Sequence, residues 1–144
     1  MARQIEAPDD DETLWIAAQL VAAGQLVEKQ TGSHLSNSLH DLPAIQCAVD
    51  HLGKDAQAFH DANALGLAFG QVYLESNPGF DWWMVEDEHG RDVALRFKHS
   101  SLLIFPGSMF TNRLEDGEKI HVAVLFAGLC REIDAIRPDL DAAV

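Results

Sequence analysis

The sequence is poor in cysteine and lacks long apolar runs, and each shortage narrows the classes of protein it can encode. Its two cysteines, Cys47 and Cys130, lie far apart and outside any CxxC pair, so neither a disulfide framework nor a thiolate metal site is indicated. No apolar run approaches the roughly 20 residues of a membrane helix, and the first residues lack the features of a secretory signal. We therefore expect a cytoplasmic protein with reduced thiols and no membrane partner.

Positive charge is also scarce. Lysine and arginine number 10 against 23 aspartate and glutamate, which gives a formal net charge of −13. A surplus of this size repels the phosphate backbone of nucleic acids and favours solubility. It can also steer a basic partner towards the protein. The charge therefore excludes nucleic acid as an expected partner. It is explained by a simply acidic, soluble protein, and a protein partner with a basic surface stays open as an alternative.

Local catalytic and metal-binding motifs are missing. The seven histidines form no HxxxH or HExxH pair, and the sequence has no GxSxG, GxxxxGK[ST] or GxGxxG segment. From the sequence we predict no metal site, no cofactor and no catalytic residue. A metal site assembled from histidines of distant segments stays open as an alternative.

The size and composition are those of one globular domain. The chain has 144 residues, of which 47% are hydrophobic and 23% charged. We expect a single domain over 1–144. Residues 1–8, which end at Pro8, and residues 139–144, which follow Pro138, are expected to be loose ends.

Three segments in the second half of the chain have the pattern of β-strands. Residues 82–85 are aromatic and β-branched, residues 92–98 alternate between polar and apolar, and residues 102–105 are almost wholly apolar. Polar turns separate them, so the pattern predicts a three-stranded antiparallel meander. A sheet of this kind has an apolar face that needs helices to cover it.

Helical periodicity fills the rest of the chain. It predicts about four α-helices, over 9–31, 41–53, 55–74 and 122–136, and a short helical turn over 107–114. The predicted fold class is therefore α+β. Gly66 and Gly70 lie one turn apart on the third helix, where each costs roughly 1 kcal/mol relative to alanine. We interpret them as a place where another backbone, such as a strand of the meander, packs closely, or else a ligand lies against bare backbone.

The turn between the first two predicted strands has the densest group of charged side chains. Glu86, Asp87, Arg91 and Asp92 could hold a cation, orient a basic ligand or perform acid–base chemistry. The same residue types also suit a plain turn whose charges pair across the hairpin.

Two adjacent tryptophans precede this turn. Trp82 and Trp83 must point to opposite faces of their strand, so we expect one in the core and the other near the wet face beside Glu86 or Asp87. An exposed indole beside carboxylates is typical of an interface. We therefore predict Trp83, Glu86, Asp87, Arg91 and Asp92 as binding residues.

Several segments in order resemble a bacterial family known only as a domain of unknown function. They are LGLAFG at 65–70, WMVEDE at 83–88 with GRD at 90–92, LIFP at 103–106 and RLEDGE at 113–118. The resemblance covers about residues 60–130, with weaker similarity around Trp15. It implies a bacterial, single-domain α+β protein and brings no reaction, cofactor or catalytic residue.

Two hypotheses about function follow. The first is a small, non-enzymatic, cytoplasmic protein-binding module of the immunity or adaptor type. The alternative is an enzyme whose site combines Glu86, Asp87 or Asp92 with a histidine. The apolar faces of the first and last helices exceed what a three-stranded sheet can cover, so a homodimer also stays open.

Overall fold

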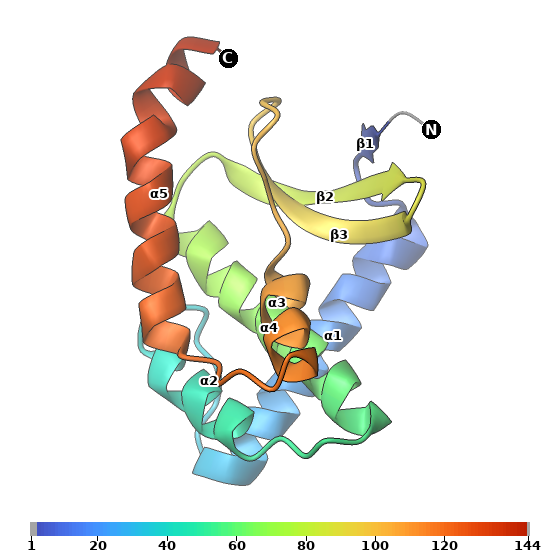
Figure 1. Ribbon diagram of the computed structural model, residues 1–144, viewed down its shortest axis with the longest axis vertical. Coiled ribbons are helices and arrows are strands. Elements are labelled where there is room, and N and C mark those ends of the chain that lie inside the picture. Colours follow the sequence, from blue (N-terminus) through green and yellow to red (C-terminus); the bar gives the residue numbers. More distant parts are fainter. Residues whose placement is uncertain (1–2, 144) are drawn as a thin grey trace.

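The computed structural model describes residues 3–143, with side chains as far as residue 139. The elements follow the order β1 (Gln4–Glu6), α1 (Asp10–Thr31), α2 (Asp41–Asp50), α3 (Ala56–Ser76), β2 (Phe80–Asp87), β3 (Gly90–Phe97), β4 (Leu103–Ile104), α4 (Pro106–Glu115) and α5 (Val122–Ala143). The predicted α+β class is confirmed. In Figure 1 the sheet lies across the upper ends of α1 and α3, and α5 runs along the left side.

The sheet has four antiparallel strands in the order β1-β2-β3-β4. The three predicted strands of the meander are confirmed as β2, β3 and β4. The expected loose start of the chain is wrong for residues 4–6, because β1 pairs with the end of β2, with Gln4 opposite Glu86. Three residues without alternation give no strand signal, and this pairing depends on a distant segment. Residues 1 and 2 lie outside the described residues.

The hairpin of β2 and β3 has two different faces. Phe80 pairs with Phe97 and Met84 with Val93 on the side that we call the inner face. There, Met84 and Val93 pack against Ile16 of α1 and against α3. The opposite side, here called the outer face, includes Trp83, Val85, Asp87, Asp92 and Leu103, because side chains alternate along each strand and antiparallel partners share a face.

Aromatic rings connect the inner face to the helices. Successive ring centroids lie 5.0 to 5.8 Å apart, all in tilted or edge-on arrangements, which suit the quadrupoles of aromatic rings. The rings are those of Phe69, Tyr73, Phe80, Phe97, Phe110 and Phe126. This cluster joins α3, the sheet, α4 and α5 into one core.

The two glycines of α3 allow α4 to approach closely. A Cβ atom added at Gly66 would lie 2.5 Å from the carbonyl oxygen of Pro106, and one added at Gly70 would lie 2.8 Å from the Trp82 ring. The prediction of close packing is therefore confirmed. The backbone that approaches Gly66 belongs to the start of α4, at Pro106 and Gly107, and not to a strand of the meander.

Helix α5 starts at a fixed point and is longer than expected. Gln46 of α2 accepts a hydrogen bond from the amide of Val122 (2.7 Å) and donates one to the carbonyl of Ile120 (2.9 Å). The prediction that residues after Pro138 are loose is wrong for 139–143, which continue the helix. Pro138 is exposed, so water can hydrate the carbonyl that the proline leaves without an amide partner. Val144 lies outside the described residues.

Candidate functional site

The five predicted binding residues do not form one cluster. Glu86 lies directly opposite Arg91 on the inner face. Trp83, Asp87 and Asp92 lie on the outer face, where Asp92 is opposite Val85 and Asp87 is opposite Gly90. The hairpin therefore separates the predicted residues into two groups with different surroundings.

Arg91 joins the hairpin to the start of the chain. Its Nε atom lies 2.6 Å from Oε2 of Glu12 and its Nη2 lies 2.9 Å from Oε1 of the same residue. Its Nη1 is 3.3 Å from Glu6 and 3.6 Å from Glu86. Hydrogen bonds from Arg91, helped by the backbone amide of Asp9, lower the pKa of Glu12 from its ordinary 4.5 to about 2. Arg91 thus holds β1 and α1 against the hairpin.

Trp83 contacts cationic and aromatic groups in place of the expected carboxylates. The guanidinium of Arg96 lies 4.7 Å from the ring centroid, and the ring of His99 lies 5.7 Å away. The expected position beside Glu86 or Asp87 is wrong: Glu86 is on the other face, and Asp87 is four strand residues away, about 13 Å along the strand. The companion, Trp82, is half-buried and donates its indole N–H to Gln71 (2.9 Å).

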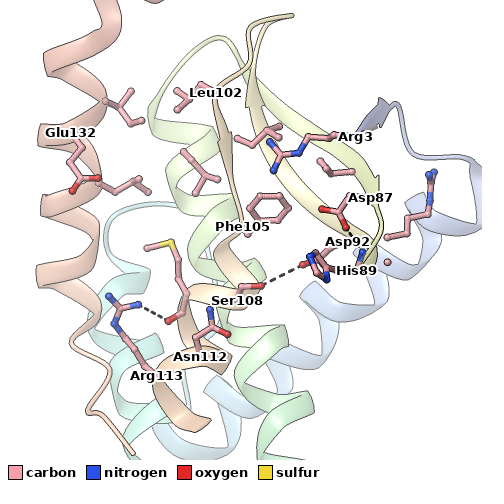
Figure 2. Close-up of a pocket in the computed structure, with 18 residues that line it drawn as sticks. Arg3, Asp87, His89, Asp92, Leu102, Phe105, Ser108, Asn112, Arg113 and Glu132 are labelled. Carbon is pink, nitrogen blue, oxygen red and sulfur yellow. Dashed lines mark hydrogen bonds between the residues drawn. The ribbon is translucent and has the colours of Figure 1, made fainter. Parts of the chain in front are cut away.

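A pocket of about 860 Å³ opens beside the outer face. Its walls come from the hairpin end, β4, α4 and α5, and Arg3 reaches it from the residue before β1 (Figure 2). We call it the outer pocket. Apolar residues line much of it, namely Val85, Leu102, Leu103, Ile104, Phe105, Met109, Leu129 and Ile133. An apolar lining with a few polar groups is typical of binding pockets.

Two carboxylates stand at the hairpin end of the outer pocket. Asp92 accepts a hydrogen bond from the amide of Val93 (2.8 Å) and lies 3.5 Å from the hydroxyl of Ser108. Asp92 as a whole residue is exposed, yet its carboxyl group is partly desolvated, and this raises its pKa. Asp87 accepts a hydrogen bond from the amide of His89 (2.8 Å). This end of the pocket is acidic.

The opposite end of the outer pocket lies between α4 and α5. There, Arg113 donates a hydrogen bond to the carbonyl of Met109 (2.9 Å), and Glu132 projects from α5 (Figure 2). Neither Arg113 nor Glu132 makes an ion pair with another described residue. The pocket therefore has ionic groups at both ends and an apolar middle.

The packing of α4 against α3 places Ser108 at this pocket. This serine lies in the first turn of α4, and that turn is seated against Gly66. The sequence reasoning identified the glycines but missed Ser108, Arg3 and Glu132 as pocket residues. Only the apolar run before Pro106 signalled that this segment is near the sheet.

The described residues contain no group of three or more His, Cys, Asp or Glu placed to hold a metal ion. His89 lines the outer pocket, and its ring lies 3.4 Å from Glu88 at the tip of the hairpin. Of the helices between residues 3 and 143, none combines the length and apolarity needed to cross a bilayer.

The fold and the outer pocket define an α+β protein whose antiparallel sheet is covered by helices on one face and bears a pocket beside the other. The chain belongs to the family described as Domain of unknown function (DUF3806), whose model matches residues 41–126. The resemblance to a family of unknown function is thereby confirmed. The matched segment contains Asp87, Asp92 and Ser108 but neither Arg3 nor Glu132.

A crystal structure of a protein from Bacteroides thetaiotaomicron VPI-5482, solved at 1.50 Å, is similar in fold. The TM-score is 0.81 at 14% sequence identity, and the alignment covers 90% of this chain and 48% of that chain. This chain thus spans about half the length of that protein, and the similarity concerns the fold alone. No curated protein matches the chain.

Proposed function

We propose that this protein is a binding module that holds a segment of another protein in the outer pocket. The observation that carries the proposal is the pocket itself: about 860 Å³, with an apolar middle and ionic groups at both ends. A peptide segment can present apolar and charged side chains together, and this lining matches such a ligand. An adaptor or immunity-type role is the biological setting that we propose for it.

A substitution at Leu103 can test whether the outer pocket binds a ligand. The Leu103 side chain is half-exposed on the outer face, and its strand partner is Arg96. Replacing it with glutamine removes apolar contact area without adding charge. Val124, an exposed residue of α5 that does not line the outer pocket, provides the matched control.

The experiment is selection of a phage-displayed library of random dodecapeptides on the full chain, followed by titration of the selected peptides. We expect Leu103→Gln to weaken binding about tenfold, which is roughly 1.4 kcal/mol, and Val124→Gln to leave it unchanged. Met109→Gln, on another wall, should also weaken binding. If no peptide is selected, or if selected peptides bind all these variants equally, the proposed function is wrong.

A second candidate function is supported by one observation. Asp92, with its raised pKa, lies 3.5 Å from the Ser108 hydroxyl inside the outer pocket, and a carboxylate with a perturbed pKa in a pocket is a candidate general acid or base. This keeps an enzyme as the alternative proposal. The distance exceeds that of an activated nucleophile–base pair, so we rank it second. Hydrolysis of a panel of chromogenic esters and phosphoesters that disappears in both Asp92→Asn and Ser108→Ala would favour it.

A further inference from the structure

The charges around the hairpin are distributed unequally between its two faces. On the inner face, Arg91 is within 4 Å of three glutamates, Glu6, Glu12 and Glu86. On the outer face, Asp87 and Asp92 occupy diagonal positions of the same hairpin, so their Cβ atoms are about 7–8 Å apart. One cationic group can therefore approach both carboxylates.

Each of these two carboxylates has only one short hydrogen bond from the described residues. Oδ1 of Asp87 is bound to the amide of His89, and Oδ1 of Asp92 to the amide of Val93. For Oδ2 of Asp92 the partner is the Ser108 hydroxyl at 3.5 Å, a long hydrogen bond. Within the described residues, no ion pair reaches either carboxylate.

The arginines that line the same pocket do not form ion pairs with Asp87 or Asp92. Arg3 lines the pocket but lies beyond ion-pair distance of Asp87 and Asp92, and Arg113 is at the far end, bound to the carbonyl of Met109. Arg91 also borders the pocket, but its guanidinium is used by the three glutamates. The hairpin end therefore presents partly desolvated negative charge, in a chain whose formal net charge is −13.

Apolar surface adjoins this acidic end. Figure 2 shows Phe105 between the hairpin end and the α5 side of the pocket, and Leu103, which is paired with Arg96, lies four strand residues from Asp92, about 13 Å along the outer face. A ligand that satisfies the carboxylates thus also meets an apolar surface next to them. Resting on the proposed function, we propose that the occupant is an extended segment of another protein. Its lysine or arginine lies between Asp87 and Asp92, and an apolar side chain about four residues later lies over Leu103 and Phe105.

The test uses the peptides selected on the full chain. The tightest peptide is resynthesised with each lysine or arginine replaced in turn by norleucine, which keeps the apolar stem and removes the charge. We expect one such replacement to weaken binding tenfold or more. Asp87→Asn and Asp92→Asn should each weaken the parent peptide by a similar factor, yet weaken the norleucine peptide by less than twofold, because the pair being broken is already absent.

Asp81→Asn is the matched control, because Asp81 is an exposed carboxylate of β2 that does not line the outer pocket. It should leave the affinity of every peptide unchanged. Selected peptides that depend on Leu103 but carry no basic residue would overturn this inference and leave the proposed function standing. Peptides that bind without dependence on Leu103 or Met109, or no selected peptides at all, would overturn both.

Discussion

The inner and outer faces of one hairpin contain the same kinds of residue, but these residues have different roles on the two faces. On the inner face, apolar side chains such as Met84 and Val93 are buried under α1 and α3, and Arg91 is surrounded by three glutamates. On the outer face, Leu103 and Trp83 are only half-buried, and Asp92 has no cation from the described chain. On the inner face, apolar side chains are buried and charges are paired within the chain. On the outer face, apolar surface and charge stay available for a ligand.

The difference shows that composition alone does not identify a site. The hairpin has acidic and basic residues on both faces, and only the register separates them. Charges that are saturated by partners contribute to the fold, while charges with spare oxygens in a pocket are available for recognition. The four predictions below test this division, beginning with the largest expected effect.

Leu67→Ala should strongly destabilise the protein. Leu67 of α3 is fully buried against Ile16, Met84 and Val93 beneath the inner face, and such truncations cost about 2–5 kcal/mol. Leu103→Ala on the outer face should cost less than about 1.5 kcal/mol, because a half-exposed side chain loses less buried area. Urea denaturation followed by circular dichroism measures both. Equal losses would mean that the two faces do not differ in packing.

Gly66→Ala should destabilise by about 1–3 kcal/mol through overpacking, although alanine has the higher helix propensity. The added Cβ would meet the backbone of Pro106 and Gly107, which hold the α4 wall of the outer pocket. Gly24→Ala in α1 is the control, because its Cβ would meet nothing within 4 Å; there we expect a gain of up to about 1 kcal/mol. A gain at both positions would show that α4 can move away at little cost.

Arg91→Leu should lower the urea midpoint at neutral pH, and the deficit should shrink as the pH falls from about 5 to 2. The pKa of Glu12 is lowered to about 2 in the folded protein, so the stability that it gains from Arg91 is present above its unfolded pKa and is lost as pH falls through the folded value. Denaturation at several pH values tests this. Arg131→Leu, an exposed site on α5, should show no such trend; a deficit that is independent of pH would contradict the ion-pair explanation.

Asp92→Asn should have the smallest effect and the opposite sign. Because burial raises the pKa of Asp92, its charged form destabilises the folded state at neutral pH. The asparagine variant should therefore be more stable by no more than about 0.5 kcal/mol, as for other surface changes, and the gain should vanish below about pH 4, where the unfolded chain also protonates. A loss of stability at pH 7 would show that the carboxylate makes a structural bond that asparagine cannot replace.

Most of the secondary structure could be predicted because its signals are local. The alternation through Val93, Leu95 and Phe97 indicated β3 and its buried face, and the helical periodicity over 55–74 indicated α3. The start and end of the chain were wrong for physical reasons. Strand β1 depends on a partner far away in the sequence, and Pro138 lies where an exposed helix tolerates it.

The candidate site could be predicted only in part. The sequence indicated that charges gather at the hairpin, but the face on which each charge lies depends on the register, and the register fixes which of them meet α1. Arg3, Ser108 and Glu132 come from three separate segments that the tertiary fold brings to one pocket. No periodicity or spacing connects such residues, so nothing local indicated the pocket.

The ion pair of Arg91 with Glu12 joins residues 79 positions apart, and this separation has a kinetic consequence. Closing so long a loop costs conformational entropy before any contact offsets it, whereas β2 and β3 are joined by a tight turn and can pair within microseconds. The hairpin should therefore form early, and β1 should add to its edge late. In the folded protein the same strand should be the first part of the sheet to open, with its amide hydrogens exchanging faster than those shared by β2 and β3.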